Sequence, residues 1–231
     1  MARINKGTLT RLEIVAEAST QFLEKGYSKT TVSSISKALE MSSGNLTFHY
    51  PTKEHLLAEL VDALCTFHWK RMEEEANDAI SSILAICLEL TAMAGACEDD
   101  PVIKDFLLSA YSNPLCLDVI RRNDARRSKE VFGDYCSDWS DEQFAMAQVL
   151  VSGIEFATLM TAGDPLPLET RISGAIRTIL GIYGIPEDVC RTKLEKVFAM
   201  DYRNIGKKAF MDFRKFVEQS NEKAFRDLLK R

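Results

Sequence analysis

Residues 30–57 read TTVSSISKALEMSSGNLTFHYPTKEHLL, and this stretch decides how the N-terminal part of the chain folds. It holds two short segments with a helical pattern, and then the start of a third helix. Helices of about two turns are unstable alone in water, so these two must pack on each other and on a neighbouring helix. The second segment carries hydrogen-bonding side chains at Ser43, Asn45, Thr47, His49 and Tyr50. Core packing alone does not explain so polar a helix.

A longer helix is expected before this stretch. Apolar side chains recur at spacings of three and four residues from Leu12 to Leu23, which is the pattern of one buried helix face. Thr10 is followed three residues later by Glu13, a capping-box pattern that predicts the start of the helix. Gly26 follows the last periodic residues and predicts its end.

The rest of the chain has the same helical periodicity, with no sustained period-two alternation that would indicate strands. The segments predicted around the quoted stretch are 32–39 after an N-cap at Thr31, 43–49 after Ser42 or Ser43, and one from Thr52 to about residue 75. Further helical segments are predicted at 78–96, 101–111, 115–136, 141–161, 168–183 and within 187–231. The sequence therefore predicts an all-α fold with a short-helix head, residues 1–52, a helical body, residues 53–186, and an additional helical segment, residues 187–231.

Composition and charge restrict the class of protein. The N-terminus has no apolar run of the signal-peptide kind, the apolar segments are interrupted by Glu89 and Glu155, and six cysteines are scattered without a CxxC pair. These features predict a cytoplasmic protein with no membrane segment. The net charge is −5, but residues 1–57 carry seven Lys or Arg and five Asp or Glu. A mildly basic head on an acidic body fits a protein whose head alone meets a polyanion, although chance asymmetry explains the charges equally well.

Two short packed helices joined by a tight turn form a helix-turn-helix, whose second helix lies in the major groove of DNA. Such a recognition helix needs one apolar residue to dock it, here Leu46, and polar residues elsewhere that reach base edges or phosphates. We expect Asn45 and Thr47 to contact bases. The other residues expected at the DNA, chiefly on its backbone, are Thr31, Ser43, Gly44, His49, Tyr50 and Lys53.

The stretch also resembles the DNA-binding segment of the TetR family of bacterial repressors, over about residues 8–57. That family's pattern has a Thr-rich cap, an Ile-x-x-Ala helix, a Gly-Val-Ser turn, a Gly-x-Leu-Tyr recognition helix and a Phe-x-x-Lys-Glu-x-Leu lead into the fourth helix. The matching residues are Thr31, Ile35, Ala38, Ser42, Gly44, Leu46, Lys53, Glu54 and Leu57, with Tyr50 where Phe is usual. Two residues depart from the pattern: Glu40 stands at the turn position usually held by Gly, and Thr47 replaces a Tyr that commonly touches the DNA backbone.

The resemblance implies a homodimer that binds a palindromic operator and a small-molecule effector in the body. Two adjacent amphipathic segments, 141–161 and 168–183, are the expected interface, with small residues that allow close helix approach at Ser152, Gly153, Ser173 and Gly174. The body supplies material for a pocket that takes an apolar or aromatic effector. The candidate pocket residues are Met93, Phe106, Tyr111, Trp139, Phe144, Met146, Phe156 and Met160.

Other classes of function have less support. The chain has three histidines, no Gly-rich phosphate loop, no GxSxG and no HExxH, so no enzyme motif is present and neither a metal nor a cofactor is expected. Cys65 and His68 lie three residues apart on a predicted helix and could form half a metal site, but no second ligand pair accompanies them. The alternative to a DNA-binding regulator is a helical adaptor that binds another protein through its head.

Overall fold

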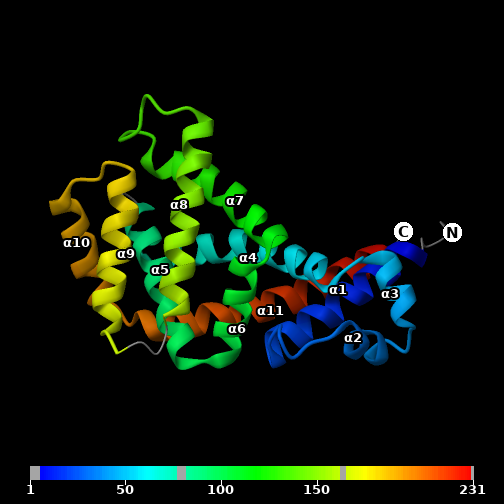
Figure 1. Cartoon of the computed structure of the whole chain (residues 1–231). Helices are drawn as coiled ribbons and strands as arrows, with labels where there is room; N and C mark the ends of the chain where they lie inside the picture. The colour runs from blue at the N-terminus through cyan, green and yellow to red at the C-terminus, as the bar shows by residue number, and fades with distance from the viewer. Residues whose placement is uncertain (1–5, 77–81, 162–164, 230–231) are drawn as a thin grey trace.

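The computed structural model describes residues 6–76, 82–161 and 165–229, and every regular element in these ranges is an α-helix (Figure 1). This confirms the predicted all-α class. Figure 1 shows a head of short helices at one end of the molecule and a larger body of longer helices at the other, with α4 and α11 running between them.

The head contains α1, α2, α3 and the start of α4. Their bounds are Lys6–Lys25, Val32–Ala38, Ser43–His49 and Lys53–Ala76. Its core consists of fully or almost fully buried apolar side chains from all four helices, namely Ile14, Ala18, Phe22, Ile35, Leu46 and Leu57. The short helices α2 and α3 are therefore stabilised by packing on α1 and α4, as their length requires.

The start of α1 differs from the prediction. The helix begins at Lys6, about one turn before the capping box expected at Thr10. The hydroxyl of Thr10 donates to the carbonyl of Lys6 at 3.0 Å, four residues back along the same helix. A Thr side chain within a helix makes this bond, so the Thr-x-x-Glu pattern here does not mark an N-cap.

The body is built around α5, whose side chains are buried on nearly every side. The body helices are α5, Ser82–Asp99; α6, Pro101–Ser112; α7, Pro114–Phe132; α8, Asp141–Met160; α9, Leu168–Ile182; and α10, Glu187–Phe198. Asp100 and Asn113 cap α6 and α7, each followed by Pro at the first helical position, where its missing N–H costs nothing. Residues 78–81 of the helix predicted over 78–96 lie outside the described residues.

The segment after residue 187 forms two helices, α10 and the long α11, Tyr202–Leu229. One end of α11 crosses α5 closely, because a Cβ at Gly206 would lie 2.2 Å from the carbonyl oxygen of Ala92. Only glycine permits that approach. The other end of α11 lies along α1 of the head, where Arg214 forms an ion pair with Glu24 (Figure 1). The C-terminal helix thus connects the body to the head.

Among the described residues, α8 is the one helix long and apolar enough to cross a bilayer by length and composition alone. Its apolar window is 39% buried within the chain. Core helices of soluble proteins pass the same test, and α8 packs on α6, α7 and α9. The apolar surface that α8 leaves exposed therefore needs a separate explanation.

Candidate functional site

The turn between α2 and α3 sets the direction of α3. Leu39 ends α2, and the amide of Met41 donates to the carbonyl of Ser36 at 2.9 Å, which closes the helix end. Glu40, between them, has φ of 52°, in the left-handed region where glycine is usual. Glu40 therefore departs from the family pattern in residue type while it keeps a glycine-like backbone conformation, and this conformation costs a non-glycine residue about 1–2 kcal/mol.

Two serines then start α3 and hold it against α2. The side chain of Ser42 accepts a hydrogen bond from the amide of Asn45 at 3.1 Å and so caps the helix. The hydroxyls of Ser36 and Ser43 lie 3.0 Å apart, joining the two helices. Leu46 is fully buried and is the apolar residue that docks α3 in the head.

The face of α3 opposite Leu46 is open. With about 100° of rotation per residue, Gly44 and Phe48 point most directly away from Leu46, and Asn45 and Thr47 flank them. Asn45, Thr47 and Phe48 are all exposed, Phe48 to 82%. A Cβ added at Gly44 would have only the Ser42 hydroxyl nearby, at 3.9 Å, so the chain itself does not require glycine there. The surface has room for the close approach of another molecule.

Phe48 is a candidate residue that the sequence analysis missed. The signal was present, because an aromatic residue two positions after the docking Leu46 cannot share its buried face. Its ring packs only edge-on against His49, with ring centroids 5.3 Å apart. An apolar ring this exposed on a candidate recognition helix is suited to contact a thymine methyl group.

Other residues predicted at the DNA face inward or are already bonded. Tyr50 is 4% exposed, with the guanidinium of Arg11 above its ring at 4.5 Å. The ammonium of Lys53 donates to the carbonyls of Tyr27 and Thr30, at 2.9 Å each, and burial lowers the pKa of Lys53. Lys53 therefore holds the turn that follows α1.

Thr31 and Thr47 use their hydroxyls within the head. Thr31 forms a capping box with Ser34, with both hydrogen bonds at 3.0 Å. The hydroxyl of Thr47 donates to the carbonyl of Gly44 at 3.2 Å, and the residue remains exposed. Arg11, which donates to the carbonyl of His49 at 3.1 Å, is an exposed cation near α3 that the sequence analysis did not single out.

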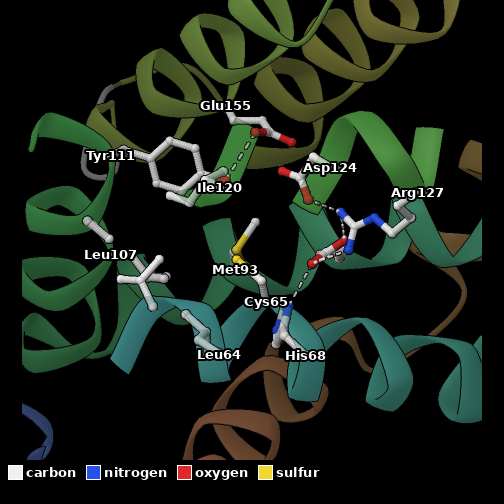
Figure 2. Close-up of a pocket in the computed structure, with 13 residues that line it drawn as sticks. Leu64, Cys65, His68, Met93, Leu107, Tyr111, Ile120, Asp124, Arg127 and Glu155 are labelled. Atoms are coloured by element: carbon white, nitrogen blue, oxygen red, sulfur yellow. Dashed lines mark hydrogen bonds and ion pairs between the residues drawn. The ribbon is translucent and has the colours of Figure 1, made fainter. Parts of the chain in front are cut away.

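A cavity lies in the body where α4, α5, α6, α7 and α8 meet (Figure 2). Its volume is about 30 Å³, room for roughly two water molecules. One side is apolar, with Leu64, Met93, Leu107 and Ile120. The polar residues that line it are Cys65, His68, Glu89, Tyr111, Asp124, Arg127 and Glu155.

The polar side contains a network of buried charges. Arg127 forms ion pairs with Glu89 at 2.7 Å and with Asp124 at 3.0 Å, and His68 lies 3.0 Å from Glu89. Burial alone would raise the pKa of Glu89, but Arg127 and His68 outweigh it and lower that pKa to about 2. Glu89 is therefore a stable carboxylate, paired with Arg127.

Asp124 and Glu155 are in a different electrostatic state. Burial, opposed by Arg127, raises the pKa of Asp124 to about 6. Burial and the carboxyl groups of Asp124 and Glu89 raise the pKa of Glu155 to about 8, so Glu155 is largely protonated at neutral pH. Tyr111 donates to Glu155 at 3.1 Å (Figure 2). Among the described residues no group of His, Cys, Asp and Glu is arranged to hold a metal ion.

The structure places only part of the predicted pocket at this cavity. Met93 and Tyr111 line it. Phe106 is fully buried against Phe210 of α11, and Trp139 and Phe144 pack on each other and on Tyr183 at the far end of the body. Phe156 is partly buried within the core, away from the lining. Met146 and Met160 are 66% and 54% exposed on the outside of α8. Aromatic and Met residues occur in cores and on surfaces as often as in pockets. Residue type alone therefore could not predict which side chains line the cavity.

The outer face of α8 is apolar and exposed. Its exposed residues follow spacings of four and three, as in a helix–helix seam: Met146, Leu150, Gly153, Ala157 and Met160. Gly153 and Gly174 have open space where a Cβ would stand, and both face outward. Ser152 does not, because it is 2% exposed and its hydroxyl accepts from Arg121 at 2.9 Å. Ser173 is partly buried on α9.

The head matches a known family of DNA-binding proteins. The family model described as bacterial regulatory proteins, tetR family, matches residues 14–60. That range runs from the buried Ile14 of α1 through the turn and α3 into α4. The head of the chain therefore matches the DNA-binding segment of the TetR family. The resemblance of residues 8–57 to that family is thereby confirmed.

The TetR-family head is also similar to that of a curated relative. The chain is 40% identical over 50 residues to the HTH-type transcriptional regulator QacR of Staphylococcus aureus. The match spans 22% of this chain and 27% of QacR, so the chain covers about a quarter of that relative's length.

The body shares its fold with solved structures. A crystal structure of RolR in complex with the ligand resorcinol is similar at a TM-score of 0.64 with 15% identity, covering 83% of this chain and 96% of RolR. RolR without ligand gives a TM-score of 0.54 over 75% of this chain and 96% of RolR, also at 15% identity. The chain therefore shares the fold of RolR in its body as well as in its head.

Proposed function

We propose that the chain is a cytoplasmic transcriptional repressor that binds a palindromic DNA operator as a homodimer and is released by a small molecule bound in its body. The observation that carries the proposal is the open face of α3. Leu46 docks the helix, while Gly44, Asn45, Thr47 and Phe48 leave the opposite face exposed. A groove-binding helix needs this division between one docking residue and an outward face.

Gly44 gives the sharpest argument for DNA. Glycine within a helix lowers stability by about 0.5–1 kcal/mol relative to alanine, and the head has space for a Cβ at this position. Glycine therefore does not stabilise the fold at this position. It does leave room for a DNA backbone or base edge to approach α3. Asn45 beside it has an exposed side-chain amide that can pair with adenine.

The outer face of α8 supports the homodimer. Met146, Leu150 and Met160 are each more than half exposed, which is costly for an isolated protein. A second copy of α8 and α9 would cover this face and complete a four-helix bundle. Two heads are also needed on physical grounds, because one seven-residue α3 offers few base contacts and a pair on a palindrome doubles them.

The test is operator binding by the purified chain against fragments of its source genome, measured by gel shift at several salt concentrations. We expect a saturable shift that weakens as salt rises. Gly44→Ala should leave the melting temperature unchanged or higher while weakening the shift, because its methyl group obstructs the approach of DNA. Asn45→Ala should change which fragments bind best, and exposed Asn204→Ala on α11 is the control that should do neither.

The alternative, an adaptor that binds protein through its head, makes the opposite forecast. If low salt gives no shift, or if Gly44→Ala binds every fragment as the parent does, α3 is not a recognition helix and the proposal is wrong.

A further inference from the structure

Two carboxyl groups line the cavity in the body, and in each of them only one oxygen has a polar partner among the described residues. Asp124 is 7% exposed, and its Oδ1 forms an ion pair with Arg127 at 3.0 Å. Glu155 accepts from Tyr111 through Oε2 at 3.1 Å. Within the described part of the chain, neither Asp124 Oδ2 nor Glu155 Oε1 has a hydrogen-bond partner. Figure 2 shows both carboxyl groups at the same end of the cavity.

Neither oxygen is sealed in the core, since the one fully buried side-chain oxygen without a partner among the described residues is Oε1 of Gln148. Asp124 and Glu155 line the cavity, so a ligand that carries hydrogen-bond donors can reach both of these oxygens. The cavity lining also contains the other groups that face them: Cys65 and His68 from α4, Glu89 from α5, Tyr111 from α6 and Arg127 from α7. The three carboxyl groups outnumber the single permanent cation, Arg127.

Arg127 is not available to an acidic ligand. Its guanidinium contacts Glu89 through both Nη1, at 3.3 Å, and Nη2, at 2.7 Å, and contacts Asp124 as well. Its face lies on the ring of Trp69, with 4.4 Å between Cζ and the ring centroid. An anion entering the cavity would meet carboxyl groups before it met an unpaired cation.

We propose that this cavity binds an apolar molecule that carries a protonated nitrogen, with the nitrogen between Asp124 and Glu155 and the hydrocarbon part against Leu64, Leu107 and Ile120. The inference rests on the proposed function in taking this cavity as the effector site. It narrows the effector from any apolar or aromatic compound to an organic cation.

Room for the hydrocarbon part comes from a neighbouring cavity. This second cavity, about 20 Å³, shares Leu64, His68, Met93 and Leu107 with the first and extends to Gly206 and Phe210 of α11. Met93 lies at the border of both. Because methionine is flexible and adapts to irregular space, a shift of its side chain joins the two cavities. The ligand then occupies the combined space beside α11.

Binding of a cation also moves a proton. Before binding, Glu155 is largely protonated at pH 7, since burial and the neighbouring carboxyl groups raise its pKa to about 8. A cation beside it favours the carboxylate, and the proton leaves to the solvent. The complex of the ligand cation with Asp124 and Glu155 is then balanced in charge to within one unit, and up to one proton is released for each ligand bound.

The experiment uses aryl-alkyl amines, each with its matched alcohol and carboxylate, and measures binding to the full-length protein by calorimetry in buffers of different ionisation enthalpy. We expect the amines to bind about 10- to 100-fold more tightly than the alcohols, the carboxylates not to bind, and amine binding at pH 7 to release a proton. Glu155→Gln should remove the proton release and most of the preference for amines. Asp124→Asn should reduce the preference, and Glu142→Gln, exposed on α8, is the matched control.

The inference is overturned if an alcohol binds as well as its amine, if a carboxylate binds best, if no amine binds, or if Glu155→Gln keeps the full preference. If Asp124→Asn does not fold, Glu155→Gln alone decides, because it replaces a group that is already largely neutral. Gel shifts separate this result from the proposed function. Amines that bind through Glu155 without changing operator affinity leave the cation site in place and remove its regulatory role. If only neutral compounds release DNA, the proposed function stands and the cation site is wrong.

Discussion

Glu40 is the residue with the clearest local strain. Its φ of 52° places a Cβ where the left-handed region disfavours one, at a cost of about 1–2 kcal/mol, of which about half is offset because glycine loses more freedom on folding. We therefore expect Glu40→Gly to raise the stability of the protein by about 0.5–1 kcal/mol in chemical denaturation. Glu40→Ala is the control for loss of the carboxylate, and it should not stabilise, because alanine keeps the Cβ. Equal effects of the two changes would mean that charge, and not backbone strain, is responsible.

Phe48 is the residue whose exposure most needs a partner. At 82% exposure it gains little from the fold, and on the open face of α3 it is placed to meet a thymine methyl group in the major groove. We expect replacement of one operator thymine per half-site by deoxyuridine, which lacks only that methyl, to weaken binding by about 3- to 10-fold, since one buried methyl contributes about 0.8 kcal/mol or more.

The Phe48→Ala variant is the matched control for this contact. It should bind the thymine operator more weakly and show no further loss with deoxyuridine, because the two changes remove the same contact. If deoxyuridine at every position leaves wild-type affinity unchanged, Phe48 does not read thymine.

Among the elements, α8 carries the apolar face that the proposed dimer would bury. Leu150, near the middle of the exposed seam, is 58% exposed in the single chain. Leu150→Glu would bring two carboxylates together at the two-fold interface, so we expect sedimentation at micromolar concentration to shift from a dimer to a 26.0 kDa monomer. Met211→Glu on α11, where Met211 is 60% exposed, is the control and should remain a dimer. If the wild-type protein sediments as a monomer, the outer face of α8 is not a dimer interface and this prediction is wrong.

The sequence predicted the elements better than it predicted their surroundings. The local signal at Ser42 predicted a helix start, because a cap acts on amides two or three residues away. The same kind of pattern failed at Thr10, whose hydroxyl bonds back along α1. Local chemistry cannot distinguish these two uses of Thr without knowing where the chain enters the helix.

The candidate sites divide in the same way. Leu46 could be assigned to the buried face of α3 and Asn45 to its exposed surface from helical periodicity alone, because both lie on one short element. The cavity could not be located from periodicity, because Glu89, Asp124 and Glu155 are brought together by three different helices. Met146 was expected in a pocket and lies on the outer face of α8, since an apolar face turned toward a partner has the same pattern as one turned toward a core.

At the scale of the whole molecule, α6 links the cavity to the head. Tyr111, near one end of α6, bonds Glu155 in the cavity wall. Asp105, on the same helix, accepts from the amide of Ser28 at 2.9 Å and from its hydroxyl, in the turn that precedes α2. Asp105 and Tyr111 are six positions apart, which corresponds to about 9 Å of rigid helix. A ligand that displaces Tyr111 therefore moves the acceptor that holds the turn of the head.

The protein also has a second connection, through α11. Phe210 borders the smaller cavity, and Arg214 one turn further pairs with Glu24 of α1. A ligand in the proposed site would act on two helices that both reach the head, and its binding energy would have to differ between the proposed DNA-competent and incompetent arrangements. A coupling of about 1–3 kcal/mol corresponds to a change of about 5- to 150-fold in operator affinity.

Asp105→Asn tests whether α6 carries this coupling. Asparagine keeps the size of the side chain but weakens its acceptance from Ser28, since hydrogen bonds to a charged group are about twice as strong. We expect the variant to bind operator within about threefold of the parent without ligand, and its ligand-induced loss of operator affinity to fall by about 5-fold or more. Asp134→Asn, exposed between α7 and α8, should respond to ligand as the parent does. Because coupling is reciprocal, operator DNA should weaken ligand binding in the parent by the factor by which the ligand weakens DNA binding, and by a smaller factor in Asp105→Asn. If the ligand response persists in full, α6 is not the connection, and the path through Phe210 and Arg214 of α11 remains to carry it.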